Sequence, residues 1–586
     1  MEPRVHYKNF QASIYCPVGN VIDVKDFKQF EEDLKHLTNH VKLSKVYLEC
    51  YRGGTFVNQE HLIKVKEFFE SRGIQTSGGI TTDDVWNHEG FTPFCYTSEK
   101  TKETVIKAVT MVSEVFDEFI LDDFYFTNCR CDQCLKAKGN RTWSEFRLDL
   151  MKNFSKDVIL ATAKKVNPKV NAIIKFPNWY EAFQDAGYNL EDEPKLFDSI
   201  YTGTETRNPT YAQQHLPKYL SYFIMQYFEH VAPGRNLGGW FDPYECTYNL
   251  TSYLEQAYLT LFGKAKEAMI FSLGSIIHDK NYGTFAAALG QAFADTDEIL
   301  EHLGKPMGIA TYLPYHSYGE DNIHNYLGMC GLPMDPYPEY PSQAKLVFLA
   351  KQAAFDPNIV EKIKESLNRG AQVVVTSGLV EQLGDAFLEF MHVNYTNQKA
   401  FVKEYMYSED GGVTVNGKVA SAKSIIIPQM RYFTNDVWEL AGAYGTDNNF
   451  PIVLRTRYSM GRIYVVTIPD NLGDLYHYPA KVWNVIRNSL CQELPYEIEG
   501  VSGVATFAYD NDTFIVRSDI PYYENISLVV HDNEVTLLDI NHKREIKGSV
   551  EKALMYDFKT SKREEQTRFS LALTPGVNQV YRMIRK

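Results

Sequence analysis

The sequence predicts an α/β protein in which a (β/α)8 TIM barrel is followed by a second α/β domain and a small C-terminal β-sandwich. Short apolar segments alternate with amphipathic segments over residues 13–275. Eight such alternations in roughly 250 residues are typical of a (β/α)8 barrel. Polar, often charged residues follow the apolar segments, at the strand ends where a barrel carries its site. A doubly wound open sheet is the structural alternative for this pattern.

Each predicted barrel strand is a short apolar or aromatic run. The eight runs are 13–16, 45–50, 73–77, 119–122, 172–176, 198–202, 237–240 and 268–271. Segments between them, such as 24–38, 58–71, 101–116 and 143–166, have the apolar spacing of amphipathic helices. We therefore expect a catalytic barrel domain over residues 1–304.

A second α/β pattern follows over residues 305–498. Strands are predicted at 308–312, 371–376, 424–427 and 462–466, with a helix at 357–368. The sequence of this region contains no Gly-x-Gly-x-x-Gly segment for binding phosphates. We therefore expect a structural or oligomeric role for this domain.

Residues 499–586 change to short alternating strands with Asp-Asn turns. Runs 506–509 and 513–516 flank an Asp-Asn-Asp turn and predict one hairpin, and runs 528–530 and 535–538 predict a second. These hairpins predict a C-terminal β-sandwich.

Composition excludes several kinds of partner. The net charge of -14 argues against a general surface for nucleic acid or anionic membrane. No window approaches the roughly 20 apolar residues of a membrane span, and the first residues lack a signal-peptide pattern. Six of the nine cysteines are scattered singly, which suits reduced thiols in a cytoplasmic protein. The 14% aromatic content fits either a sugar-binding cleft or a tyrosine-rich core.

A cysteine cluster, Cys129-x-Cys131-x-x-Cys134, follows the fourth predicted strand. Three cysteines cannot all pair with each other, and the first two are too close in sequence for a relaxed disulfide. A tetrahedral Zn²⁺ would use all three thiolates and a fourth ligand, for which Cys95 in the loop past the third strand is the candidate. Four thiolates leave no open position, so such a zinc would be structural. Reduced thiols without metal are the alternative.

The segment that runs from Phe94-Cys95 through the acid-ended fourth strand to Cys134 resembles family 42 glycoside hydrolases, the β-galactosidases. The resemblance implies that four cysteines hold a structural zinc and that no organic cofactor is needed. It also implies that the second domain is a flavodoxin-like trimerisation domain and that the protein is a homo-oligomer, a trimer. The implied substrate is a galactoside-type carbohydrate.

The catalytic positions depart from this family. An Asn-Glu pair is expected at the end of the fourth strand, where Asp122-Asp123 stands, and a nucleophilic Glu after the seventh, where Asp242 stands. We align Asp123 with the family's acid/base and keep Asp122 as a nucleophile candidate. If the strand continues through both, only one of them should face the barrel mouth.

The sixth strand ends in the polar run 201–207. Glu205 is a candidate acid or nucleophile with Arg207 binding substrate, although the two could form a plain ion pair. A fourth-strand Asp nucleophile with a sixth-strand acid resembles the α-galactosidase clan and would mean α-linked substrates. Further substrate-binding candidates at strand ends are Arg52, Lys175, Trp179, Tyr201, Trp240 and Glu245.

These observations predict a retaining glycoside hydrolase that acts on a small glycoside or oligosaccharide. Its pair of carboxylates is drawn from Asp122, Asp123, Glu205 and Asp242. One alternative is a non-catalytic carbohydrate-binding or assembly protein on the same scaffold. Another is a sugar lyase or isomerase, which would need a base such as Lys175 or Tyr201.

Overall fold

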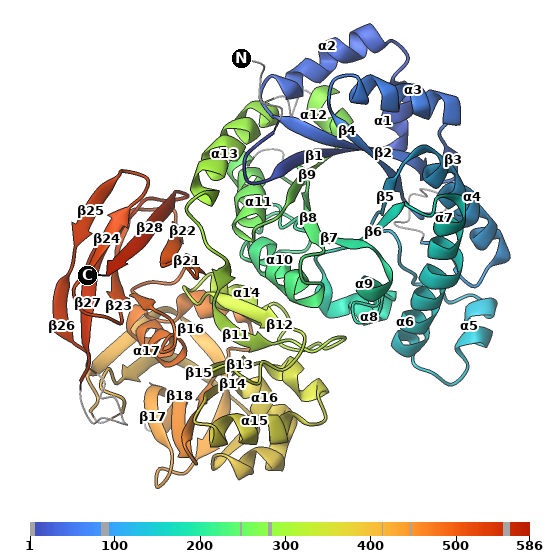
Figure 1. Cartoon of the computed structure of the whole chain (residues 1–586). Coiled ribbons are helices and arrows are strands. Elements are labelled where there is room, and N and C mark those ends of the chain that lie inside the picture. The colour runs from blue at the N-terminus through green and yellow to red at the C-terminus, as the bar shows by residue number, and fades with distance from the viewer. Residues whose placement is uncertain are drawn as a thin grey trace. The chain divides into compact units, whose positions relative to one another are not determined.

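A computed structural model describes residues 6–83, 93–246, 249–278, 284–412, 414–445, 448–554 and 563–585 (Figure 1). The chain divides into two compact units, Met1–Glu301 and His302–Lys586. Among the described residues, none of the helices has both the length and the apolar character needed to cross a bilayer.

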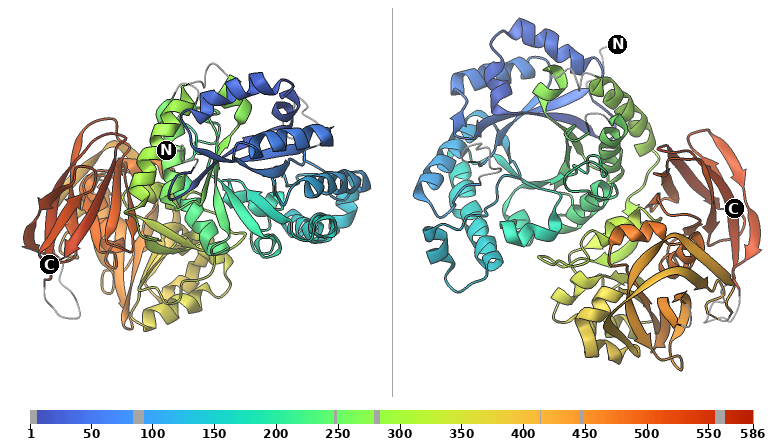
Figure 2. Two further views of the ribbon diagram at one scale, coloured as in Figure 1. Left: turned by 45° about the horizontal axis from the view of Figure 1, so that its top comes forward. Right: turned by 180° about the vertical axis from the view of Figure 1, so that it is seen from behind.

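The first unit is a closed barrel of eight parallel strands surrounded by helices (Figure 2). The strands are β1 Gln11–Cys16, β2 Leu43–Arg52, β4 Gln75–Ile80, β5 Glu118–Leu121, β6 Asn171–Phe176, β7 Ser199–Gly203, β8 Asn236–Phe241 and β9 Glu267–Phe271. β1 pairs with both β2 and β9, which closes the ring. The short β3 (Thr55–Phe56) pairs antiparallel with the end of β2. Each predicted strand overlaps one of the eight, so the barrel is confirmed and the open sheet is wrong.

The helices of this unit follow the strands in the expected order. They are α1 Val18–Asp23, α2 Phe27–Thr38, α3 Gln59–Glu70, α4 Glu99–Val115, α5 Asp132–Lys138, α6 Trp143–Phe154, α7 Ala161–Val166, α8 Phe183–Ala186, α9 Glu193–Leu196, α10 Leu220–Val231, α11 Leu250–Phe262, α12 Leu273–His278 and α13 Phe285–Leu300, with a 3-10 turn η2 Tyr180–Ala182. The helix predicted at 143–166 contains a π-helical segment, η1 Ser155–Leu160, between α6 and α7. Such segments are often found at functional sites.

Side chains fill the barrel in layers because alternate strand residues face inward. The middle layer is a buried cluster of Tyr15, Tyr47, Ile120, Ile173, Tyr201, Trp240 and Met269. Two residues before this layer, Lys45 pairs with Glu118 (2.6 Å) and Glu267 (2.8 Å). Two residues after it, at the carboxyl ends of the strands, lie Glu49, Asp122, Lys175 and Asp242. An apolar layer thus separates two charged ones.

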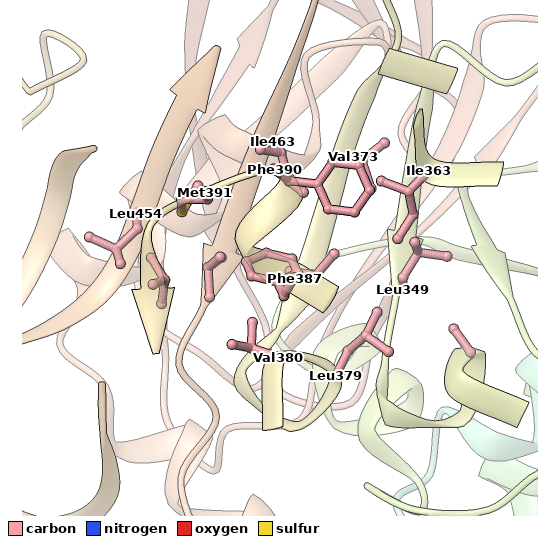
Figure 3. Packing of buried hydrophobic residues seen from close by; sticks show 14 of the residues in the cluster. Leu349, Ile363, Val373, Leu379, Val380, Phe387, Phe390, Met391, Leu454 and Ile463 are labelled. Carbon is pink, nitrogen blue, oxygen red and sulfur yellow. The ribbon is translucent and has the colours of Figure 1, made fainter. Parts of the chain in front are cut away.

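The second unit begins with a mixed nine-stranded sheet in the order β12-β11-β13-β14-β19-β18-β17-β15-β16, of which the first five strands are parallel. The strands are β11 Ile309–Tyr312, β12 Met334–Tyr337, β13 Leu346–Leu349, β14 Gln372–Thr376, β15 Val393–Tyr407, β16 Gly417–Tyr432, β17 Trp438–Gly445, β18 Asn448–Tyr458 and β19 Gly461–Val466. Its helices are α14 Ile323–Gly328, η3 Lys351–Phe355, α15 Ile359–Asn368, α16 Ser377–Leu383, η4 Gly384–Glu389, η5 Leu472–His477 and α17 Ala480–Leu490. Figure 3 shows its core, where Ile363 of α15 and Phe387 of η4 are buried with Val373 of β14.

The chain ends in two packed antiparallel sheets, ordered β10-β21-β22-β28-β24-β25 and β20-β23-β27-β26. The strands are β10 Pro306–Met307, β20 Tyr496–Glu499, β21 Val504–Tyr509, β22 Thr513–Ser518, β23 Glu524–Val530, β24 Val535–Asp539, β25 Arg544–Lys547, β26 Ser549–Lys552, β27 Glu565–Leu573 and β28 Asn578–Arg585. The first predicted hairpin is the β21–β22 pair. The second is wrong, because β23 and β24 lie in different sheets and the turn between them crosses the sandwich.

Gly238 permits the close approach of β8 and β9, and its replacement tests the barrel packing. A Cβ added there would lie 2.1 Å from the backbone oxygen of Glu267. We expect Gly238→Ala to lower the free energy of unfolding by about 1–3 kcal/mol, as overpacking does in other cores. Denaturant unfolding measures this change. Gly19→Ala in α1 is the control, since that position has no heavy atom within 4 Å of an added Cβ, and equal effects of the two variants would contradict the packing argument.

Candidate active site

One buried ammonium brings together the carboxylates at the mouth of the barrel. Lys175, on β6, lies 2.6 Å from an oxygen of Asp123 and 3.0 Å from an oxygen of Glu205. It lies 3.8 Å from Asp122. Three of the four predicted catalytic acids, from the ends of β5 and β7, therefore surround the Nζ atom of one lysine.

Both aspartates after β5 reach this lysine, although alternation along a strand would separate them. β5 ends at Leu121, and the backbone N–H of Tyr125 donates to the carbonyl of Asp122 (3.0 Å), which turns the chain. The backbone N–H of Asp123 also donates to the Asp122 carboxylate (2.7 Å). The alternation that would have turned one aspartate away does not apply here, because the strand stops before both of them.

A second cation connects the first aspartate to β2. The Arg52 guanidinium donates to Asp122 (3.0 Å) and to Glu49 (2.9 Å), and the Thr81 hydroxyl donates to both carboxylates. Tyr15 and the backbone N–H of Val18 also donate to Glu49. Arg52 thus joins two protein carboxylates from β2 and from the end of β5.

The carboxyl groups at the barrel mouth outnumber the cations that pair with them. Among the described residues, Glu49, Asp122, Asp123 and Glu205 pair with two cations, Arg52 and Lys175. Burial, with the like charges of Asp122 and Glu205, raises the pKa of Asp123 to about 8 even though Lys175 opposes the shift. Burial would also raise the pKa of Asp122, but Lys175 and Arg52 outweigh it and lower that pKa. Of the two neighbouring aspartates, Asp123 is thus the one whose carboxyl group holds a proton more readily.

The lysine itself stays charged. Burial would lower the pKa of its ammonium, but the surrounding carboxylates outweigh burial and raise it. The Nζ atom also lies 4.2 Å from the centre of the Trp240 ring. This side chain acts as a fixed positive charge and a poor base.

Asp242, the fourth predicted acid, lies at the end of β8 in a separate ion-pair group. The Arg207 guanidinium donates hydrogen bonds to both of its oxygens, at 3.0 and 2.8 Å, and to Glu245 at 3.2 Å. Arg207 and Glu245 both have a positive φ, 53° and 54°, which residues other than glycine rarely adopt. Glu205 bonds to Lys175 instead, so the plain Glu205–Arg207 ion pair is not the arrangement found.

Gly203 leaves room for the Glu205 carboxylate. A Cβ at position 203 would lie 2.5 Å from the second oxygen of Glu205. The Glu205 backbone carbonyl accepts from Asn178 (2.7 Å), which fixes the end of β7.

The three predicted aromatic binders lie at different depths. Tyr201 is fully buried in the middle layer of the barrel and does not reach the mouth. Trp240 is 3% exposed, and its ring packs on Tyr15 (4.6 Å) and Phe271 (5.2 Å), so it supports the site from beneath. Trp179 is half-buried beside Tyr188 in the loop after β6.

Sequence reasoning missed the residues that brace the site from behind. Tyr188 donates to the backbone carbonyl of Asp123. The next residue, Asn189, donates its N–H to buried Glu193 (3.0 Å), which also accepts from Ser155 in the π-helical segment (2.7 Å). No sequence signal marks Glu193. Glu49 did have a signal. It follows Lys45 and Tyr47 at every second position of the strand, and Arg52 stands three residues further on, so it could have been recognised as a residue that faces the barrel mouth.

The four cysteines of the cluster converge as predicted. The sulfurs of Cys95, Cys129, Cys131 and Cys134 all lie within 4.8 Å of one another. Cys95 is 3.6 Å from both Cys131 and Cys134. Thiolates at about 2.3 Å from a tetrahedral zinc are separated by roughly 3.8 Å, so the donor set and its spacing fit a metal ion such as zinc.

Three family models match the chain. One described as "Probable glycosyl hydrolase, catalytic domain" matches residues 2–306, which is more than half of the chain. The chain belongs to this probable glycosyl hydrolase family. Models described as "Uncharacterized protein SSO3021, second domain" and "Probable glycosyl hydrolase, C-terminal domain" match residues 304–471 and 495–583. The uncharacterized protein SSO3021 of Saccharolobus solfataricus is 25% identical over 578 residues, covering 89% of this chain and 91% of that protein.

Solved structures with this probable glycosyl hydrolase fold include family 42 β-galactosidases. The enzyme from Bacillus circulans sp. alkalophilus aligns with a TM-score of 0.64 at 13% identity and covers 98% of both chains. Gan42B of G. stearothermophilus gives 0.64 at 12% identity over 100% of this chain and 99% of that one. α-L-Fucosidase isoenzyme 2 of Paenibacillus thiaminolyticus gives 0.62 at 12% identity over 99% and 100%. The family 42 fold predicted from the sequence is confirmed.

Buried Glu193 gives this probable glycosyl hydrolase a pH-dependent stability. Burial raises the pKa of Glu193 to about 8, and within the described residues no lysine or arginine pairs with it. An acid whose pKa is higher in the folded state than in the unfolded state destabilises the fold as the pH rises. For Glu193 this loss begins near the ordinary glutamate pKa of about 4.3 and is complete near pH 8. Glu193→Gln cannot ionise, so its unfolding free energy should improve relative to wild type between pH 5 and 8, by about 1.4 kcal/mol per unit at most. Urea denaturation at each pH measures this, and a difference that stays flat with pH would contradict it.

Proposed function

We propose that the barrel mouth hydrolyses glycosidic bonds with retention of configuration, and that Asp123 and Glu205 form its catalytic pair. The shared ammonium of Lys175 carries this proposal, since one oxygen of each carboxyl group lies within 3.0 Å of Nζ. These oxygens must then be nearer to each other than the roughly 6.5 Å at which inverting pairs begin. Such spacing supports retention, for which the two carboxyl groups stand about 5–5.5 Å apart.

The proton balance supports the assignment of roles. Asp123, whose pKa is raised to about 8, donates its proton to the glycosidic oxygen as the bond breaks. Glu205 attacks the anomeric carbon and forms a covalent glycosyl-enzyme. Water then attacks the anomeric carbon and gives its proton to Asp123 while the bond to Glu205 breaks, which releases the sugar and restores both groups. Lys175 stays charged and holds the two carboxyl groups in place.

Asp242 remains the second candidate for the nucleophile because it stands at the end of the seventh barrel strand. The Arg207 guanidinium binds its two oxygens, and such a bidentate pair fixes the orientation of the carboxylate. A sugar lyase is disfavoured, because the buried ammonium of Lys175 is a poor base in contact with three carboxylates.

The proposed substrate is a galactoside-type glycoside or small oligosaccharide. Two β-galactosidases share the fold, which supports a β-linked galactoside. The pairing of a fourth-strand and a sixth-strand acid, and the α-L-fucosidase with this fold, support α-linked sugars as the second candidate. We further propose a cytoplasmic homo-oligomer, a trimer by resemblance, and free thiols at all nine cysteines support a reducing compartment.

Chromogenic glycosides test the catalytic pair. Wild type should release nitrophenol from one anomeric series of α- and β-galactosides and fucosides. We expect Asp123→Asn to lower kcat by about 10²–10⁴-fold, as loss of a general acid does, and Glu205→Gln to abolish release. Azide should restore turnover of Glu205→Gln and give a glycosyl azide of inverted configuration, because the small anion replaces the missing nucleophile.

Matched variants separate the alternatives. Glu298→Gln changes an exposed acid on α13 and should leave turnover unaffected. If Asp242→Asn lost turnover and azide restored it, and Glu205→Gln did not behave in this way, the nucleophile would be Asp242. Release by wild type from neither anomeric series, nor from natural oligosaccharides, would favour the non-catalytic carbohydrate-binding protein.

We propose that the four cysteines hold a structural Zn²⁺, with Cys95 joining the loop after β4 to the loop after β5. The Thr97 hydroxyl lies 3.1 Å from the Cys95 sulfur and 3.2 Å from that of Cys134, close enough to donate to bound thiolates. Zinc here would brace the chain that leads from Asp123 to α5.

Metal analysis of the purified protein tests the zinc assignment. We expect one zinc per chain, lost in Cys134→Ser together with a lower thermal midpoint, because three thiolates no longer close the tetrahedron. Cys330→Ala, at a buried cysteine in the second unit, should keep the metal. Wild-type protein that stays metal-free after incubation with zinc would support the reduced-thiol alternative.

A further inference from the structure

The second unit contains a parallel sheet with the strand order of flavodoxin. Numbered along the chain, the order β12-β11-β13-β14-β19 is 2-1-3-4-5. In such sheets ligands bind beyond the carboxyl ends of the strands where the order reverses, which here is between β11 and β13.

The anion-binding position at this point is filled by the protein itself. The Glu320 carboxylate, from the loop after β11, accepts from the backbone N–H groups of Lys351 (2.8 Å) and Gly378 (3.2 Å) and from the Thr376 hydroxyl (2.5 Å). A Cβ at Gly378 would lie 2.3 Å from that carboxylate. The Glu320 carboxylate takes up these three donors, so they are not available to a phosphate group of a nucleotide or flavin.

An aromatic pair lies in the segments that follow the two strands at the switch point. Tyr318 follows β11 and Phe355 ends η3 after β13, with ring centres 4.6 Å apart and planes at 63°. Their side chains remain 54% and 45% exposed. Each ring therefore keeps part of its surface open to solvent.

The loop that carries Tyr318 is held rigidly. His316, Gly319, Glu320 and Asn322 all have positive φ, and the Glu320 hydrogen bonds fix the centre of the loop. Strained backbone persists only where the surroundings enforce it, and it is concentrated at binding sites. The Tyr318–Phe355 pair, which we call the platform, is therefore preorganised.

Charged groups border the platform. The Lys351 side chain packs against Gly319, at 3.1 Å from a Cβ added there, and its ammonium pairs with Glu381 at 2.9 Å. Exposed aromatic faces bind the apolar C–H face of a pyranose, and a neighbouring ion pair offers both a donor and an acceptor for its hydroxyls.

We propose that Tyr318 and Phe355 form a second carbohydrate-binding site for uncharged glycan chains, separate from the barrel mouth. The donors that Glu320 occupies are not available to a phosphate group, and the exposed rings with the Lys351–Glu381 pair suit a neutral sugar. The choice of glycan as ligand rests on the proposed glycosidase function.

Affinity electrophoresis in gels that contain galactan, galactomannan or xylan tests this site. We expect at least one polysaccharide to retard wild type and Asp123→Asn equally, since the platform does not need catalysis. Tyr318→Ala combined with Phe355→Ala should weaken the apparent Kd about tenfold or more with unchanged hydrolysis of nitrophenyl glycosides. Tyr318→Trp, which keeps an aromatic face, should retain binding.

The control is Tyr523→Ala, which removes an isolated ring, 79% exposed, in the C-terminal sandwich and should leave retardation intact. Equal retardation of wild type and the double variant would overturn the proposal, as would no retardation in any gel. So would a change in the mass of the double variant by light scattering, which would assign the rings to contact between copies of the chain. Retardation without hydrolysis would reject the proposed enzyme activity while keeping this site.

Discussion

The buried ammonium of Lys175 is the interaction on which the barrel mouth depends. It faces carboxylates from two strands, and without it these like charges would repel one another in a medium that screens them poorly. It rests in turn on the Trp240 ring, which packs against Tyr15 in the middle layer. Aromatic side chains of the barrel therefore support the charged layer at its mouth, and the raised pKa of Asp123 reflects its burial and the neighbouring charges of Asp122 and Glu205.

Strand alternation explains how this arrangement is built. Inward residues recur every second position, so an aromatic layer at one level fixes which residues face the mouth one level further. β2 illustrates this with Lys45, Tyr47 and Glu49 at three successive levels, the first and last charged and the middle one apolar in its packing. β5 stops before Asp122 and Asp123, so the alternation does not apply to them and both reach Lys175.

The sequence predicted the barrel because eight apolar runs and their polar ends are local features. The cysteine cluster was likewise readable, since three of its members lie within six residues. The partners of each acid were not, because they depend on which strands become neighbours and where each one ends. Glu205 was expected beside Arg207, yet it turns to Lys175 on the adjacent strand. Glu193 could not be found, since a buried acid held by Ser155 has no signature in the chain.

Gly203 and Glu205 are linked in a way that constrains how this protein could change over evolution. The missing side chain at position 203 is occupied by the Glu205 carboxylate, so any larger residue there would push the acid out of its place. A lineage that lost the glycine first would lose the acid's position with it, whereas one that first shortened Glu205 to aspartate would free the space for alanine. The order of these substitutions, and not only their identity, would decide which descendants keep a carboxylate in this position.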